Sequence, residues 1–397
     1  MTQPSFLREP WPSDIARPGG SAARSAEQAF ALVEARMRVT LAEVGTGWPH
    51  YADPETGRWT TTSRGDWTGC YWAGMLWIAE AAGAPVEASA TRKALLRQTE
   101  TRAGDDTVSR AFIFYFGAAL GAILGRDREA ERIAVLGARA LARSYNPRAR
   151  IIPIGSDSEE EHSMGPQHVT IDGLVGSLPL LAWAAQVTGD GELRHIARED
   201  ALRHREFCVR DDGSVCQSAQ FDPRSGDLVR RYTHKGFSHD STWGRAQAWA
   251  IVAFAAAAKW YPEEPLFLST ACAVADWWLA HAPADDCVLW DFDAPLGSFR
   301  DSSASAIAAA GLLKLAPHLR EEQGKRYHAA AERQILALSN RYLTPIGAGE
   351  VRPPGMLIES CYNPHVALAT RHELIWGSYY LYEGLAVLAG RLRPDVI

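Results

Sequence analysis

The sequence lacks the features that mark several large classes of protein. Its 397 residues carry 41 Lys and Arg against 47 Asp and Glu, a formal net charge of −6. Because a nucleic-acid-binding surface needs an excess of basic side chains, we expect no nucleic-acid partner. No uninterrupted apolar run of membrane-spanning length is present, so we expect no membrane span. The first residues also lack the basic and then apolar pattern of a secretory signal peptide.

Cysteine is scarce, and its spacing shows no metal-binding pattern. The six Cys residues include no CxxC pair, so we expect reduced thiols in a cytoplasmic protein rather than disulfides or a zinc site. A P-loop, a GxGxxG turn before a helix, HExxH and GxSxG are all missing, which disfavours redox and phosphoryl-transfer enzymes. We therefore expect neither a metal nor another cofactor. The oligomeric state is left open.

Helical periodicity of apolar residues is plentiful. It predicts helices near 26–43, 68–82, 88–102, 108–124, 127–144, 171–188, 191–207, 241–261, 264–282, 303–317, 322–343 and 373–391. Helices that are apolar on nearly all sides, such as 108–124, alternate with amphipathic ones, such as 127–144. This alternation, with a period of roughly 50–65 residues, predicts inner and outer helices.

About six such pairs would close into an all-α (α/α)6 barrel, with a superhelical solenoid as the alternative. Since no linker-like segment interrupts the pattern, we expect one domain over 25–397, preceded by an N-terminal arm at 1–24. The weakly alternating stretch 213–233 predicts a small hairpin.

Tryptophan is abundant, with 14 residues. Indole rings fill protein cores and also stack on sugars, so a group of them near polar residues would indicate a carbohydrate cleft. The long polar loops lie at 44–67, 145–170, 208–240, 283–302 and 344–372. In a helical barrel the loops that enter the inner helices meet at one mouth, where function is expected.

Asp172 stands at the start of the strongly apolar helix 171–188. One interpretation is that it caps the N-terminus of this helix, a position that Asp favours. The other is that its carboxylate protrudes into the barrel, where an apolar wall would raise its pKa. A general acid at neutral pH requires such a raised pKa. The residues alone leave both interpretations open.

The segment 232–249 gathers several charged and aromatic side chains before an apolar helix. Arg245 and Trp249 are four residues apart and therefore share one helix face. This pair would suit an anionic sugar, with the guanidinium on a carboxylate and the indole on the ring. The structural alternative is an ion pair of Arg245 with Asp240 or Asp66.

Three other segments carry candidate residues. Trp67 precedes an inner helix, and 300–306 has the pattern of a capped helix start. Asp105 and Asp106 stand just upstream of an inner helix. Paired carboxylates suit acid–base chemistry, and they are also ordinary residues for a helix N-terminus, where the helix dipole favours them.

Five segments, in order along the chain, resemble the unsaturated glucuronyl hydrolases, glycoside hydrolase family 88: 66–77, 171–183, 234–249, 301–307 and 375–383. That family is an (α/α)6 barrel. It acts on sugars left by polysaccharide lyases, which carry a C4=C5 double bond in a terminal uronic residue. The resemblance implies that an Asp protonates the vinyl ether and helps water to add at C5. The hemiketal then opens and releases the neighbouring sugar.

The same resemblance implies roles for individual residues. The acid–base Asp of the family matches Asp172, two pocket residues match Arg245 and Trp249, and a ring-stacking Trp matches Trp67. His234, from the third segment, joins the expected substrate-binding residues.

At three positions the chain departs from the family pattern. A second active-site Asp, from a His-Asp pair, falls on Ser109, an active-site His falls on Gln217, and a Gln falls on Lys235. Asp105 or Asp106 would replace the second Asp only if their loop shifts. A Lys at 235 would hold a carboxylate or a sulfate more strongly, or lower the pKa of Asp172.

Three functions are consistent with these residues. The first is a glycoside hydrolase that releases a terminal 4,5-unsaturated uronic acid from a small anionic oligosaccharide. There Asp172 is the acid–base, Lys235 and Arg245 hold the carboxylate, and Trp67 and Trp249 stack on the sugar. The second is a lyase or an isomerase/dehydratase of a saturated uronic derivative, with Lys235 as a base. The third is a non-catalytic glycan-binding protein or a helical scaffold.

Overall fold

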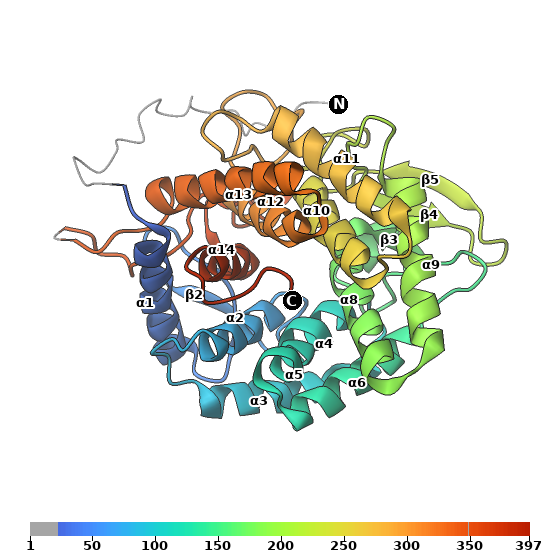
Figure 1. Cartoon of the computed structure of the whole chain (residues 1–397), viewed down its shortest axis with the longest axis horizontal. Helices are drawn as coiled ribbons and strands as arrows, with labels where there is room; N and C mark the ends of the chain where they lie inside the picture. The colour runs from blue at the N-terminus through green and yellow to red at the C-terminus, as the bar shows by residue number, and fades with distance from the viewer. Residues whose placement is uncertain (1–22, 348) are drawn as a thin grey trace.

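The structure is a computed structural model that describes residues 23–347 and 349–397. Their helices form two concentric rings (Figure 1). The inner ring contains α2 (Cys70–Ala81), the run α4 (Arg110–Phe114), η2 (Tyr115–Ala119) and α5 (Leu120–Gly125), α8 (Ile171–Thr188), α10 (Gly244–Trp260), α12 (Ser302–Leu315) and α14 (Ile375–Leu388). Neighbours in this order pack against one another, and α14 packs against α2. The ring is therefore closed, which excludes the solenoid.

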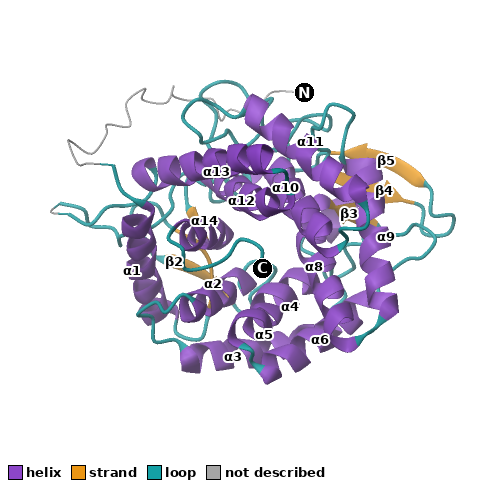
Figure 2. Ribbon diagram, viewed as in Figure 1, coloured by secondary structure: helices purple, strands orange, loops and turns teal. Residues whose placement is uncertain are grey.

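The outer ring covers the inner one. It consists of α1 (Ala26–Val44), α3 (Ser89–Glu100), α6 (Arg128–Ala142), α9 (Gly191–Cys208), α11 (Pro265–His281) and α13 (Glu321–Arg341). Each outer helix packs against the inner ring, for example α9 against α8 and α11 against α10, and α6 packs against both α4 and α8. Figure 2 shows how helices dominate this arrangement. The predicted (α/α)6 barrel is confirmed.

Side-chain burial explains which helices lie inside. Helix α12 is buried along nearly its whole length. In α6, the buried residues form one stripe that includes Ile133 and Leu141, while charged residues face water. Helix α8 has the length and apolarity of a membrane-crossing helix, and 78% of it is buried inside the barrel, as expected for a core helix.

The predicted helices agree with the observed ones to within about three residues at each end. The predicted hairpin is present as β4 (Ser218–Phe221) and β5 (Leu228–Tyr232), which pair antiparallel. Strand β3 (His168–Thr170), which completes that sheet, is not predicted from the sequence. Neither is the second sheet of β1 (Trp48–Ala52), β2 (Trp59–Thr62) and β6 (Glu373–Leu374), nor the short helix α7 (Glu161–Met164). These elements are too short to show periodicity.

The two sheets mark the end of the barrel at which inner helices begin. Strand β3 runs directly into α8, and β6 runs directly into α14. Of the predicted arm at 1–24, only Ala23 and Arg24 lie within the described residues. Arg24 donates hydrogen bonds to Asn340 and Ser339, near the end of α13.

Candidate active site

A small pocket lies where inner helices begin. Its lining comes from distant parts of the chain: Trp67, Val108, Ser109, Phe112, Ile154, Ser158, Glu159, Glu160, Thr170, Asp172, Lys235, Trp243, Arg245, Trp249 and Tyr362. The sequence-predicted residues Trp67, Ser109, Asp172, Lys235, Arg245 and Trp249 are thus brought together. Three indole rings beside charged groups match the pattern expected of a carbohydrate cleft.

Asp172 occupies the first turn of α8 and is partly buried. Its Oδ2 accepts a hydrogen bond from Nε2 of Gln217 at 3.3 Å. Its Oδ1 is buried and has no hydrogen-bond partner among the described residues. The carboxylate therefore does not cap the backbone of α8, and Oδ1 is available to a ligand.

The surroundings of Asp172 disfavour its charged form. Burial makes the largest contribution, and the negative charge of Glu160 adds to it. Lys235, His234 and the Gln217 hydrogen bond act in the opposite direction, and the net effect is a pKa raised to about 6. A carboxyl group with this pKa is partly protonated near neutral pH, as a general acid must be.

Lys235 is buried and forms an ion pair with Glu160. Its backbone N–H donates to Oε1 of Gln217 at 3.0 Å. Although burial alone would lower the pKa of Lys235, the charge of Glu160 raises it above its usual value. Nε2 of His234 lies 3.4 Å from the Glu160 carboxylate, and its Nδ1 is bonded to Ser218. Lys235 and His234 hold the pKa of Glu160 well below its usual range in spite of burial.

Glu159 and Glu160 line the pocket but are not among the residues predicted from the sequence. Both belong to the long polar loop 145–170, where a run of three Glu residues is indistinguishable from a solvated surface. Glu159 accepts hydrogen bonds from Nε1 of Trp67 at 2.8 Å and from the Tyr362 hydroxyl at 2.7 Å. It thereby ties the loop to two aromatic residues of the pocket wall.

Arg245 is fully buried and already paired. Its guanidinium donates to Oδ2 of Asp301 at 2.7 Å and to the carbonyl oxygen of Tyr362 at 2.5 Å. The partner of Arg245 is therefore Asp301, rather than Asp240 or Asp66. Asp301 also accepts two backbone N–H bonds at the start of α12, which confirms the predicted cap there.

Asp105 and Asp106 do not line the pocket. Asp105 pairs with Arg102 and with Arg64, the latter at 3.0 Å, and these cations outweigh burial and lower its pKa. Asp106 accepts hydrogen bonds from the backbone N–H and the hydroxyl of Ser156, which lower its pKa. Both carboxylates are thus held in other contacts.

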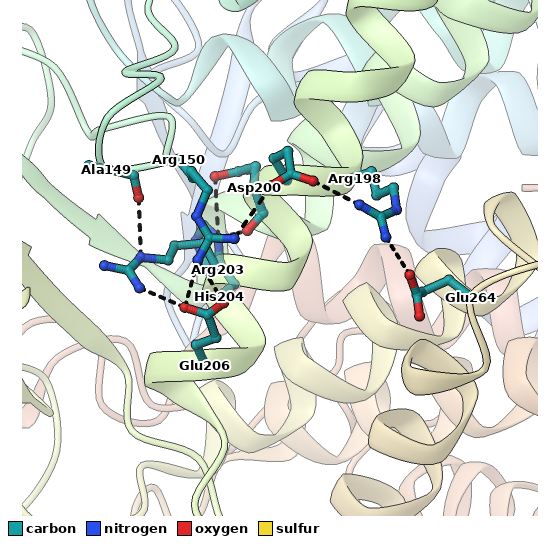
Figure 3. Close-up of polar contacts among 9 residues, drawn as sticks. Ala149, Arg150, Arg198, Asp200, Arg203, His204, Glu206 and Glu264 are labelled. Atoms are coloured by element: carbon teal, nitrogen blue, oxygen red, sulfur yellow. Dashed lines mark hydrogen bonds and ion pairs between the residues drawn. The ribbon is translucent and has the colours of Figure 1, made fainter. Parts of the chain in front are cut away.

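A side chain of helix α9 contacts the backbone of Thr170, the residue that precedes α8. The buried His204 contacts the carbonyl oxygen of Thr170, two residues before Asp172, at 3.2 Å through Nε2. Burial would lower the pKa of His204, but Asp200 raises it above its usual value. Asp200 also accepts the backbone N–H of Ile152 and so fixes the loop. Figure 3 shows this region, with the neighbouring ion pairs of α9.

The described residues offer little that would hold a metal. Within residues 23–347 and 349–397, no three His, Cys, Asp or Glu side chains are grouped as metal ligands would be. All six Cys residues are free thiols.

No protein-family model matches the chain, but individual relatives do. The unsaturated glucuronyl hydrolase of Bacillus sp. strain GL1 is 34% identical over 353 residues, covering 87% of this chain and 92% of that protein. The unsaturated chondroitin disaccharide hydrolase of Streptococcus pyogenes serotype M1 is 29% identical over 331 residues, covering 81% of this chain and 80% of that protein.

Solved structures of unsaturated glucuronyl hydrolases are also similar to this chain. A complex of UGL with dGlcA-Glc-Rha-Glc has a TM-score of 0.84 at 31% identity and covers 92% of this chain and 97% of that one. The 1.8 Å crystal structure of the Bacillus sp. GL1 unsaturated glucuronyl hydrolase has a TM-score of 0.83, with the same identity and coverage. The chain belongs to the unsaturated glucuronyl hydrolase family and is a glycoside hydrolase.

Proposed function

We propose that this hydrolase removes a terminal 4,5-unsaturated uronic acid from lyase-generated oligosaccharides, and that Asp172 catalyses the hydration of the C4=C5 vinyl ether. The observation that carries the proposal is the Asp172 carboxyl group, whose Oδ1 is buried and has no hydrogen-bond partner within residues 23–347 and 349–397. With a pKa of about 6 it can both give and accept a proton near neutral pH.

In this reaction protonated Asp172 gives its proton to C4, and positive charge develops at C5 and the ring oxygen. The Asp172 carboxylate then takes a proton from water as the water oxygen bonds to C5. The resulting hemiketal breaks its bond between C5 and the ring oxygen, and the hemiacetal thus formed at C1 releases the neighbouring sugar as an alcohol. One water is consumed, and Asp172 ends protonated, as it began.

Other pocket residues support binding of a small anionic oligosaccharide. The Lys235 ammonium would receive the uronate carboxylate, with His234 beside it. Trp67 and Trp249 line the pocket with aromatic rings that suit sugar stacking, and Ser109 is part of the same lining. Gln217 shapes the pocket by orienting Asp172 through a hydrogen bond. Arg245 shapes it through its ion pair with Asp301.

A lyase or an isomerase/dehydratase would need Lys235 as a neutral base. Glu160 raises the pKa of Lys235, so the amine stays protonated at neutral pH and has no free lone pair. No observation in the pocket favours that reaction. A cytoplasmic location is part of the proposal, since six free thiols, five of them buried, suit a reducing compartment.

The test is an ultraviolet absorbance time course on a panel of lyase-generated unsaturated disaccharides, each beside its saturated counterpart. We expect loss of the absorbance of the conjugated double bond, with release of the second sugar, for at least one unsaturated member and for no saturated one. Unchanged absorbance across the panel, or cleavage of a saturated counterpart, would contradict the proposed reaction.

A further inference from the structure

The pocket at Asp172 is narrow in the free protein. Its volume is about 40 Å³. Pockets that bind drug-sized ligands start at about 300 Å³. Ser158, Glu159 and Glu160 form part of the lining, so residues 156–160, here called the lid segment, occupy space that a substrate would need.

Hydrogen bonds and ion pairs connect the lid segment to the rest of the protein. Its sequence, Ser-Asp-Ser-Glu-Glu, contains no apolar side chain. Ser156 and Asp157 exchange hydrogen bonds with Asp106, at distances of 2.7 to 3.0 Å. Glu159 accepts from the Tyr362 hydroxyl. A segment with few buried apolar contacts opens locally at low free-energy cost, so these contacts are compatible with withdrawal of the lid segment.

Glu160 presents to Lys235 the same chemical group that a uronate presents. Its carboxylate forms the ion pair with the Lys235 ammonium and lies 3.4 Å from His234. The other cation in the lining, Arg245, is occupied by Asp301 and backbone carbonyl groups. A substrate carboxylate that reached Lys235 with Glu160 still in place would put two anions on one ammonium, next to Asp172.

We propose that residues 156–160 are a lid in which Glu160 occupies the subsite for the substrate carboxylate. Substrate enters by exchanging its own carboxylate for that of Glu160 on Lys235. This inference rests on the proposed function, which makes the substrate a uronate. As a consequence, the free enzyme binds substrate more weakly than an enzyme without the lid would. Only the fraction of molecules whose lid is open can bind, and the apparent affinity is lowered in proportion to that fraction.

Binding of a disaccharide to a catalytically inactive variant tests directly whether the substrate carboxylate replaces that of Glu160 on Lys235. The dissociation constant for an unsaturated, unsulfated chondroitin disaccharide is measured by calorimetry with Asp172→Asn and with Asp172→Asn/Glu160→Gln. Glutamine keeps the size of Glu160 but cannot compete as an anion. We expect binding about tenfold tighter in the double variant, the gain when a state populated at about one part in ten becomes dominant.

The matched control is Asp172→Asn/Asp240→Asn. Asp240 is exposed on the loop that carries Lys235, so this change removes one negative charge near the mouth without touching the ion pair. We expect its dissociation constant to stay within about twofold of the Asp172→Asn value. Equal tightening in both double variants would assign the effect to net charge and overturn the lid.

The remaining outcomes separate the two proposals. Unchanged or weaker binding after Glu160→Gln, with the disaccharide still bound by Asp172→Asn, overturns the lid and leaves the proposed function standing. No binding by either protein overturns the proposed function and the lid with it. Hydrogen exchange on Asp172→Asn alone gives a second measurement. Amides at 156–160 should exchange about tenfold faster when disaccharide binds, and slower or unchanged exchange overturns the lid.

Discussion

The side-chain amide of Gln217 donates to Oδ2 of Asp172 at 3.3 Å, while its oxygen accepts the backbone N–H of Lys235 at 3.0 Å. Gln217 is fully buried, so one side chain orients both the proposed acid and the residue that bears the proposed carboxylate-binding ammonium. The family pattern has a His at this position. Gln217 therefore has a positioning function that is open to test.

Replacing Gln217 by Leu should raise the pKa of Asp172, because the amide hydrogen bond that favours the carboxylate is lost. The alkaline limb of the kcat/KM profile should move up by about one pH unit, and kcat should fall about tenfold through loss of orientation. A pH profile from 5 to 9 measures both. An alkaline limb that stays in place or moves down would show that the hydrogen bond does not act on Asp172.

Asp172→Asn should stabilise the fold at pH 8 and about half as much at pH 5. The folded-state pKa of about 6 exceeds the usual 3.8, so ionisation of Asp172 destabilises the folded state progressively as pH rises from about 4 through 6. Because Asn cannot ionise, the variant should gain about 3 kcal/mol above pH 7 and about half of that at pH 5. Urea unfolding at both pH values measures this, and an equal effect at the two would contradict the raised pKa.

Lys235→Gln should raise KM about 10- to 100-fold, since the proposed carboxylate contact loses its charge, and should change kcat much less. Steady-state kinetics on an unsaturated disaccharide gives both constants. Lys325→Gln is the control, because Lys325 is exposed and pairs with Glu321 on the surface of α13. A large fall in kcat with KM unchanged would instead assign a chemical step to Lys235.

Arg245→Met should act mainly on stability. Removing one partner of a buried ion pair leaves the Asp301 carboxylate without its cation, which costs about 3–5 kcal/mol. Chemical denaturation measures the loss, with the exposed Arg132→Met as control. A variant of normal stability and raised KM would show that Arg245 holds the substrate carboxylate directly.

The helices could be predicted from the sequence because the apolar pattern of each helix lies within one continuous segment. An inner helix such as α8 is apolar on all sides and an outer helix such as α6 on one stripe, and both patterns are visible within one segment. The short strands β1, β2, β3 and β6 gave no such signal. Each has at most five residues and depends on pairing with distant segments.

The site was only partly predictable for a related reason. The positions of Asp172 and Trp249 could be predicted because the helices that carry them, α8 and α10, could be predicted. The partner of Arg245 lies 56 positions away at Asp301, and that of Lys235 lies on a loop that precedes α8. Which carboxylate meets which cation depends on the closure of the ring. Glu160 therefore became visible as a pocket residue only in three dimensions.

The central claim is that Asp172 is the acid that hydrates the double bond, and a comparison of wild type with Asp172→Asn tests it most directly. Turnover of an unsaturated disaccharide is followed by ultraviolet absorbance, and binding of the same disaccharide to Asp172→Asn by calorimetry. We predict a fall in kcat of about 10²- to 10⁴-fold with the disaccharide still bound. A variant that binds and retains more than about a tenth of wild-type turnover would contradict the claim.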